Sequence, residues 1–283
     1  MSAFAAQWLD LREPADRRAR DAGVLAAVAR HFGDRTQITV TDLGCGTGAT
    51  MRALGPHLPV RQRWHLVDHD AGLLDAIAPR CHGQLPTTRE IAWQPHQANL
   101  QDDLEAVLSL PAELVTMSAL LDLTSTAWLD RLVDAAAAHR RPIYAALTYN
   151  GRISFEPTDP FDAQVLRAFN AHQRRDKGFG PAIGPLAPSA VKERLTACGF
   201  TILDADADWV LDGRDGVLQA ELVQGCHGAA CEQDVLERRK LDRWLLRRLD
   251  LARAGQSHAT VGHCDIWAYP PTLDPRSRSN STS

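Results

Sequence analysis

Apolar and polar residues alternate along the chain with two different periods. Between residues 38 and 149, short apolar runs are separated by segments with helical spacing, and segment 126–138 carries an apolar stripe at i, i+3, i+4 and i+7. The pattern predicts helices over 14–32, 47–54, 71–78 and 126–138, with a short one after Gln101. It predicts strands over 38–44, 63–70, 91–99, 112–120 and 142–149. Such repeats favour a parallel α/β sheet with helices on both faces.

The pattern changes after residue 149. Residues 150–186 hold many Gly and Pro residues and a polar centre, which predicts an inserted lid or substrate region with one helix at about 160–173. A helix over 188–198, a strand over 200–211, extra helices within 216–254 and a last strand over 258–270 are predicted next. We expect one domain over 1–272 and a disordered tail over 273–283, because the tail has nothing apolar to bury.

Composition narrows the class of protein. The chain of 283 residues is 45% hydrophobic and 23% charged, with a formal net charge of -4. A globular protein is expected, and nucleic-acid binding is disfavoured because no basic field surrounds the molecule. The Arg-rich segment 237–248 is diluted by acidic residues and is interpreted as a solvated amphipathic helix. No run suits a membrane helix and no signal peptide is indicated, so we expect no membrane partner and a cytoplasmic location.

Six cysteines are scattered along the chain, and none forms a C-x-x-C pair. In a cytoplasmic protein they are expected to be reduced thiols. Cys226 and Cys231, with His227 and the pair His263–Cys264, form the best candidate metal cluster. Their C-x4-C spacing differs from that of ordinary zinc sites, so no metal is expected.

The segment TVTDLGCGTGATMRA, residues 39–53, places Gly44, Gly46 and Gly48 where a strand turns into a helix. Glycines at such a turn allow close approach of a ligand to the backbone. A dinucleotide site uses G-x-G-x-x-G spacing, but here the third glycine comes one residue early. A nicotinamide-dependent oxidoreductase therefore fits less well and stays a competing hypothesis. Asp42, at the strand end, is placed to hydrogen-bond an ammonium group.

The D-x-G-x-G-x-G segment resembles motif I of the class I S-adenosylmethionine-dependent methyltransferases. The resemblance covers about residues 15–150 and the terminal strands. It implies a seven-stranded, mostly parallel Rossmann-like sheet whose last strand is antiparallel, an enzyme of the EC 2.1.1 class, and S-adenosyl-L-methionine as cofactor.

The resemblance also implies roles for residues at the strand ends. The glycine loop with Asp42 would hold the amino-acid part of the cofactor, and an Arg before the motif, with Arg20 preferred, would bind its carboxylate. The acid ending the second strand would hold the ribose hydroxyls, and residues after the second and third strands would flank the adenine. The implied cofactor site comprises Arg20, Asp42, Gly44, Cys45, Gly46, Gly48, Asp68, His69, Asn99, Leu100 and Ser118.

Candidate catalytic residues follow the fourth and fifth strands, because ligands of open parallel sheets bind at the carboxyl ends of the strands. They are Asp122, Tyr149 and, in the insertion, His172. A general base is needed only for an acceptor that carries a proton. Each candidate also has a purely structural interpretation, for example Asp122 as a cap of the following helix region and His172 as a solvated loop residue.

The extra segments predict a lid, and a lid favours a small-molecule acceptor. Residues 118–121 (SALL) also lack the Asn-Pro-Pro-Tyr of amino-group methylases of macromolecules. The pattern specifies neither the methylated atom nor the oligomeric state. The alternative hypothesis is a catalytically inactive, methyltransferase-like module that binds S-adenosylmethionine and serves as a partner or regulatory subunit, since no decisive catalytic constellation stands out.

Overall fold

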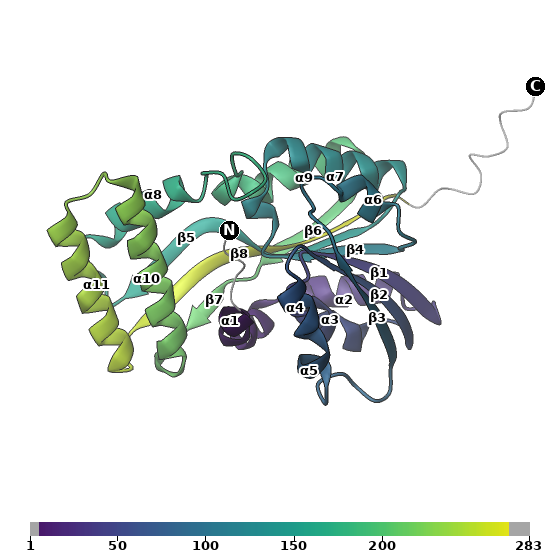
Figure 1. Ribbon diagram of the computed structural model, residues 1–283, viewed down its shortest axis with the longest axis horizontal. Helices are drawn as coiled ribbons and strands as arrows, with labels where there is room; N and C mark the ends of the chain where they lie inside the picture. The colour runs from purple at the N-terminus through teal and green to yellow at the C-terminus, as the bar shows by residue number, and fades with distance from the viewer. Residues whose placement is uncertain (1–5, 272–283) are drawn as a thin grey trace, which may run out of the picture.

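Within residues 6–271, which the computed structural model describes, eight strands form one mixed sheet (Figure 1). The strand order is β3-β2-β1-β4-β5-β8-β6, with β7 paired to β8. Strands β1 to β5 are parallel, whereas β8 is antiparallel to β5, β6 and β7. The strands are β1 (Gln37–Leu43), β2 (Arg61–Asp68), β3 (Glu90–Gln97), β4 (Leu114–Ser118), β5 (Ile143–Glu156), β6 (Thr201–Asp206), β7 (Trp209–Leu211) and β8 (His258–Tyr269). The predicted fold class and antiparallel last strand are confirmed, with β7 as an additional strand.

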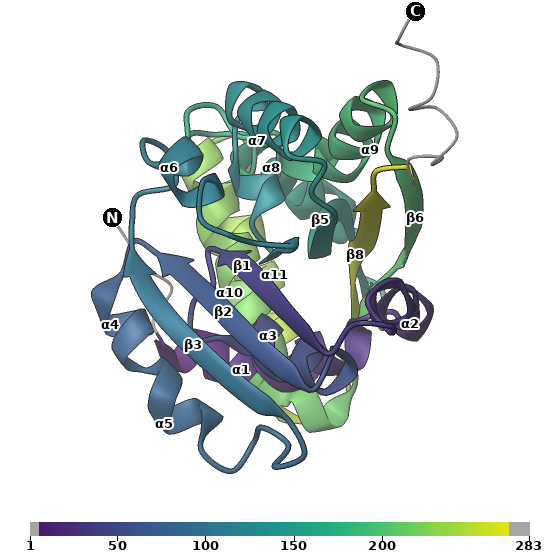
Figure 2. The ribbon, with the colours of Figure 1, turned by 90° about the vertical axis from the view of Figure 1, so that its right-hand side faces the viewer.

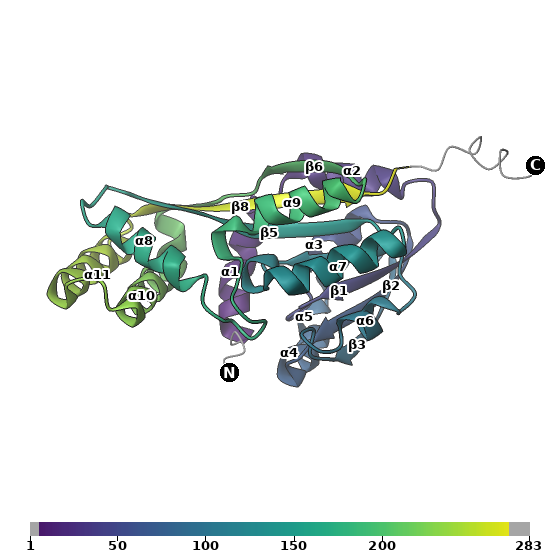
Figure 3. The same cartoon turned by 90° about the horizontal axis from the view of Figure 1, so that it is seen from above.

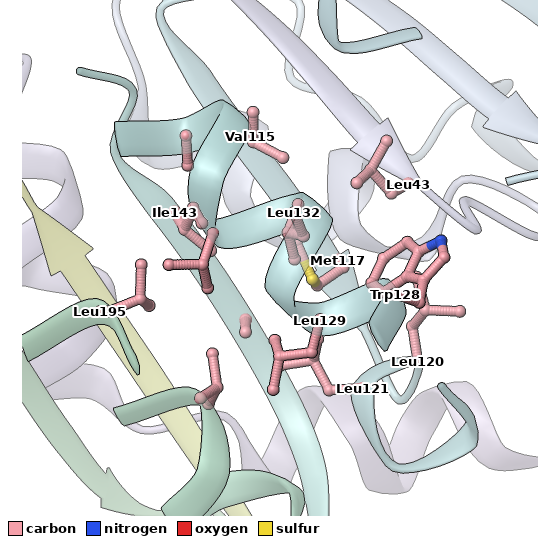
Figure 4. Close-up of a cluster of buried hydrophobic side chains, with 14 of the residues drawn as sticks. Leu43, Val115, Met117, Leu120, Leu121, Trp128, Leu129, Leu132, Ile143 and Leu195 are labelled. Atoms are coloured by element: carbon pink, nitrogen blue, oxygen red, sulfur yellow. The ribbon is translucent and has the colours of Figure 1, made fainter. Parts of the chain in front are cut away.

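Helices cover both faces of the sheet (Figure 2). One face packs against α2 (Ala22–His31), α3 (Ala49–Leu54), α4 (Ala71–Asp75) and α5 (Ile77–Cys81). The other packs against α6 (Leu104–Leu108), α7 (Thr126–Ala138) and α9 (Ala187–Ala197). Figure 4 shows the second core, where Leu129 and Leu132 of α7 meet Met117 of β4. Strand residues alternate between the two cores, as a period of two requires.

A separate lobe is built on the long antiparallel pair of β5 and β8 (Figure 3). Beyond the main sheet this pair carries β7 and the helices α8 (Asp162–His172), α10 (Gly216–Gln233) and α11 (Arg238–Arg253). A third hydrophobic core, with Trp244 and Phe155 among its members, lies inside the lobe. Since β5 runs parallel to β4, the lobe extends from the carboxyl edge of the parallel sheet, where ligands of this architecture bind.

Several predicted elements differ from the structure. The predicted helix 14–32 is two helices, α1 (Ala6–Ala19) and α2, because Asp21 caps the second by accepting a hydrogen bond from the backbone N–H of Val24. The fifth strand continues past residue 149, because Asn150 and Gly151 form an irregularity within the strand, where the register shifts and Gly151 has a φ of 90°. The predicted strand 200–211 is divided into β6 and β7.

No helix within residues 6–271 is long and apolar enough to cross a membrane. The tail over 273–283, predicted to be disordered, lies outside the described residues.

Candidate functional site

The glycine loop follows β1 at the carboxyl edge of the sheet. Gly44, Gly46 and Gly48 have φ angles of 63°, 53° and 82°, in the left-handed region where other residues are strained. A Cβ atom at Gly46 would lie 3.0 Å from a methyl group of Leu9. A Cβ atom at Gly44 would lie 3.3 Å from Leu120. Glycine is therefore required here both by the turn and by close neighbours.

Asp42, the acid two residues before Gly44, is fully buried. Its Oδ1 accepts a hydrogen bond of 2.7 Å from the hydroxyl of Thr116, while its Oδ2 has no partner within the described chain. Burial raises the pKa of Asp42 to about 7. A buried carboxylate oxygen without a donor costs stability, so this atom is suited to receive a donor from a ligand.

Asp68 joins the end of β2 to the glycine loop. Its carboxylate accepts a hydrogen bond from the backbone N–H of Gly46 at 2.9 Å and another from that of Asp70 at 3.0 Å. The neighbouring His69 is exposed, with Nδ1 3.3 Å from the Asp68 carboxylate. Asp68 is thus held in a fixed orientation beside the loop.

Arg20, between α1 and α2, is buried beside the end of β4. Its guanidinium donates hydrogen bonds to Ser118 Oγ at 3.1 Å and to the hydroxyl of Tyr144 at 3.3 Å. Tyr144 in turn donates to the buried carboxylate of Asp265 at 3.0 Å. The structure therefore brings together Arg20 and Ser118, two residues separated by 98 positions in the sequence.

Two residues at this edge adopt strained backbone conformations. Ala119 and Leu147 have φ angles of 50° and 52°. The backbone N–H of Ala119 donates to the carbonyl of Ala146, and that of Leu147 donates to the Asp265 carboxylate at 2.8 Å. Such strain persists where surrounding bonds enforce it, and it concentrates at functional sites.

Replacing Ala119 by glycine is expected to stabilise the protein by about 0.5–1 kcal/mol, since the relief of left-handed strain exceeds the added chain entropy. Urea unfolding followed by circular dichroism measures the change. Ala135→Gly in α7 is the matched control, and it is expected to cost about 1 kcal/mol because a helix interior disfavours glycine. If Ala119→Gly loses as much stability as the control, the backbone of Ala119 is not strained.

Helix α1 lies across the glycine loop. Glu13 pairs with the fully buried guanidinium of Arg52 in α3, with an Oε1 to Nε distance of 2.8 Å. Asp10 pairs with Arg80 of α5 at 2.6 Å. The crevice between α1 and α3, which Arg20 and Ala49 help to line, is too narrow for a water molecule. Helix α1 is therefore packed closely against α3 beside the glycine loop.

Asn99 and Leu100, predicted to flank an adenine, follow β3. The Asn99 side chain is exposed and engaged within its own loop, where it donates to Asp102 at 2.7 Å and accepts from the backbone N–H of Gln101 at 3.1 Å. Leu100 is buried and its carbonyl accepts a hydrogen bond from the indole of Trp128 at 2.6 Å. The geometry accounts for both residues as parts of the loop, and their contact with a base stays a prediction.

Asp122 is the predicted catalytic residue whose surroundings best suit chemistry. It lies in the short turn η2 (Leu121–Leu123), directly after β4, and is buried. Its Oδ1 has no hydrogen-bond partner among residues 6–271. Burial raises the pKa of Asp122 to about 6, opposed in part by the charge of Arg12. A carboxylate with this pKa can accept a proton near neutral pH.

Tyr149 and His172 have other partners. The Tyr149 hydroxyl donates a hydrogen bond of 2.8 Å to Asn170 of α8, and burial raises the pKa of Tyr149 well above its ordinary value. The two ring nitrogens of His172 lie 3.1 Å from the Glu232 carboxylate and 3.2 Å from the Lys177 ammonium. These contacts give both residues structural roles in the lobe, and their catalytic roles stay predictions.

Several residues at this edge were not singled out by sequence motifs. Thr116, Tyr144 and Asp265 complete the polar contacts around Asp42 and Arg20. Asp265 had a recognisable signal, because it is a lone acid within the apolar run of β8 and is fully buried. A charged residue at a core position indicates a paired buried group.

Comparisons with protein-family models and with curated proteins found no match. Among solved structures, a cyclopropane-fatty-acyl-phospholipid synthase-like protein from Lactobacillus casei matches with a TM-score of 0.52 and 14% identity, over 89% of this chain and 91% of that one. The YcgJ protein from Bacillus subtilis matches with a TM-score of 0.47 and 13% identity, over 89% and 100% of the two chains.

Phosphoethanolamine N-methyltransferase 2 of Haemonchus contortus, solved with S-adenosylhomocysteine, matches with a TM-score of 0.42 and 14% identity, over 89% of this chain and 53% of that one. Of the three similarities, the one to the Lactobacillus casei protein establishes the shared fold.

Proposed function

We propose that this protein is an S-adenosylmethionine-dependent methyltransferase acting on a small-molecule acceptor. The observation that carries the proposal is the unpaired carboxylate oxygen of Asp42, buried beneath a glycine loop whose three glycines all adopt left-handed conformations. This buried carboxylate has the right charge to bind an ammonium group, and the loop backbone allows a ligand to approach closely.

The surrounding residues fit the other parts of the cofactor. Arg20 is suited to bind the methionyl carboxylate. Its guanidinium has five N–H donors, and Ser118 and Tyr144 accept hydrogen bonds from only two of its nitrogen atoms. Asp68 matches the ribose hydroxyls, since its carboxylate is held in place by backbone N–H groups. When bound, the cofactor supplies an electrophilic methyl group on a sulfonium.

The same residues disfavour a dinucleotide. A pyrophosphate on the glycine loop would lie close to the buried carboxylate of Asp42, and two anions repel each other. The sheet also differs from the usual dinucleotide-binding order, because antiparallel β8 lies between β5 and β6. The nicotinamide-dependent alternative therefore has less support than methyl transfer.

The contribution of the protein to catalysis would be positioning and the exclusion of water. Holding two reactants in line can supply about 7–11 kcal/mol of the barrier. Helix α1 lies next to the glycine loop, with Leu9 close to Gly46, and would shield a bound ligand from water on that side. Asp122 is placed to accept the proton that a hydroxyl or amine acceptor loses.

Titration calorimetry with S-adenosylhomocysteine tests the proposal. We expect saturable one-to-one binding by the wild-type protein, with NADH showing no binding under the same conditions. The measurement requires no knowledge of the acceptor. Absence of S-adenosylhomocysteine binding, or preferential binding of NADH, would overturn the proposed function.

The affinity for S-adenosylhomocysteine is expected to rise about tenfold between pH 6 and pH 8, because Asp42, with a pKa of about 7, must be ionised to bind an ammonium. The stability of the free protein should change in the opposite direction. The folded pKa lies above that of an ordinary Asp, so ionisation costs stability as pH rises from about 4 through 7.

Calorimetry at pH 6, 7 and 8 checks the binding profile. Asp42→Asn keeps the hydrogen bond from Thr116 but has no carboxylate to titrate, so its weaker binding should be nearly independent of pH. A wild-type affinity that is flat over this range would assign the ammonium contact to another group.

A further inference from the structure

Beneath α1, at the junction of the sheet and the lobe, lies a second group of buried polar atoms. The Oδ1 of Asp122, the Nδ1 of His263 and the indole N–H of Trp8 have no hydrogen-bond partner anywhere in the described chain. They come from three elements, namely η2, β8 and α1. Asp122 and His263 are each more than nine-tenths buried, with exposed fractions of 8% and 6%.

Neighbouring residues relate these three groups to one another, with Tyr149 next to His263 and Arg12 one helical turn from Trp8. Tyr149 pairs with His263 across β5 and β8, with ring centroids 6.2 Å apart. Asp122 lies close enough to the backbone of Tyr149 for that backbone to lower the pKa of its carboxyl. The charge of Arg12 acts on both Asp122 and His263. Trp8 precedes Arg12 by one helical turn, so both lie on the same face of α1.

The cations near this group are already engaged with other acids. Arg12 lies over the ring of Trp209, 5.2 Å from its centroid, and pairs with Asp16 at 2.9 Å. Lys177, from the segment after α8, is attracted mainly to Glu232 and less to Asp122. Burial and Arg12 lower the pKa of His263 to about 3, so its ring is neutral at pH 7. One carboxylate oxygen, one imidazole nitrogen and one indole N–H are therefore left for a ligand.

We propose that Asp122, His263 and Trp8 form the acceptor-binding pocket, exposed when α1 opens. The acceptor is then a small molecule that presents an O–H or N–H group to Asp122 and a lone pair to the indole N–H of Trp8. This inference rests on the proposed function, and it restricts the acceptor class to hydroxyl and amine nucleophiles.

Methyl transfer in this pocket requires only the acceptor, S-adenosylmethionine and the Asp122 carboxylate. The acceptor oxygen or nitrogen forms a bond to the methyl carbon while the bond from that carbon to the sulfonium sulfur breaks. The proton of the acceptor passes to the Asp122 carboxylate. S-adenosylhomocysteine leaves with a neutral sulfur. His263 contacts the acceptor and orients it, and Trp8 closes over it with α1.

A buried polar group that serves a ligand has no partner in the free protein. Its removal should therefore stabilise the ligand-free protein. Asp122→Asn removes the charge and keeps the shape of the side chain, and His263→Phe keeps an aromatic ring. Trp8→Phe removes the indole N–H together with one of the two fused rings. We expect Asp122→Asn and His263→Phe each to raise the Tm of the ligand-free protein by about 2 °C or more. The matched control is Thr124→Val, because Thr124 is buried nearby and its hydroxyl donates to the carbonyl of Leu121 at 2.9 Å. The control is expected to lower Tm.

Transfer of labelled methyl groups provides the second measurement. Phenols and primary amines are compared with their methyl ethers and tertiary amines, with S-adenosylmethionine as donor. We expect transfer only to compounds that carry the proton. It should fall at least 100-fold in Asp122→Asn and at least tenfold in His263→Phe, with S-adenosylhomocysteine affinity unchanged within twofold.

The results separate this inference from the proposed function. Failure of the wild type to bind S-adenosylhomocysteine would refute the proposed function. With that binding intact, a fall in Tm for Asp122→Asn and His263→Phe like that of Thr124→Val would make them structural residues and overturn the pocket. Transfer to acceptors without a proton would overturn it as well. If no compound in the panel is methylated, the Tm shifts test the pocket by themselves. A rise in Tm for Asp122→Asn and His263→Phe supports it, and a fall overturns it.

Discussion

Replacing Asp68 by alanine is expected to weaken the binding of S-adenosylhomocysteine at least 100-fold. The carboxylate has two roles in the proposed complex, because it would accept hydrogen bonds from the ribose hydroxyls and it already fixes the backbone N–H of Gly46. Hydrogen bonds to a charged group contribute about 1.5–3 kcal/mol each, so the loss of two gives at least the stated factor. Calorimetry at pH 8, where Asp42 is mostly ionised, measures the effect.

Two variants separate the roles of Asp68. Asp68→Asn keeps one oxygen for the Gly46 N–H but loses the charge, and an intermediate affinity is expected. Asp75→Ala removes an exposed carboxylate from the neighbouring α4 and should leave the affinity within twofold of the wild type. An Asp68→Ala protein that binds as tightly as Asp75→Ala would exclude Asp68 from the cofactor site.

The sequence predicts those site residues that are adjacent in the chain or that stand at the end of a predicted strand. The glycine loop and Asp42 adjoin each other in the chain, and Asp68 ends a strand directly after the apolar pair Leu66 and Val67. The positions at which parallel strands end are set by the fold, so Asp42, Asp68 and Ser118 were expected at one edge of the sheet. Arg20 was predicted from its place beside the apolar face formed by Ala19 and Ala22, and its contact with Ser118 depends on the fold.

The lobe was harder to predict, because local turn signals and long-range strand pairing favour different structures at the same residues. The many Gly and Pro residues after position 149 predicted that the fifth strand ends there, and Asn-Gly at positions 150–151 is itself a strong turn signal. In the structure, pairing with β8 resumes at Ile153, and Gly151 absorbs the irregularity. Tertiary pairing therefore overrides turn propensity at this point. The unpaired atoms of His263 and Trp8 also have no sequence signal, because they depend on contacts between distant elements.

Asp265 is the residue whose loss is expected to destabilise the protein most. It is fully buried in β8 and accepts three hydrogen bonds, from the backbone N–H of Asp21 at 3.1 Å, the hydroxyl of Tyr144 at 3.0 Å and the backbone N–H of Leu147 at 2.8 Å. It also faces the buried charge of Arg20. The Asp265 carboxylate therefore holds the start of α2 and the strained Leu147 next to each other.

Asp265→Ala is expected to lower the free energy of unfolding by about 4 kcal/mol, since three buried donors lose their acceptor and a buried cation loses a counter-charge. Asp265→Asn retains an acceptor oxygen and should cost about half as much. Tyr144→Phe removes one donor together with its bond and should cost about 1 kcal/mol. Urea unfolding at pH 7 ranks the three variants. If Asp265→Ala costs no more than Tyr144→Phe, the carboxylate does not hold α2 and Leu147 in place, and another contact must enforce the left-handed backbone at that position.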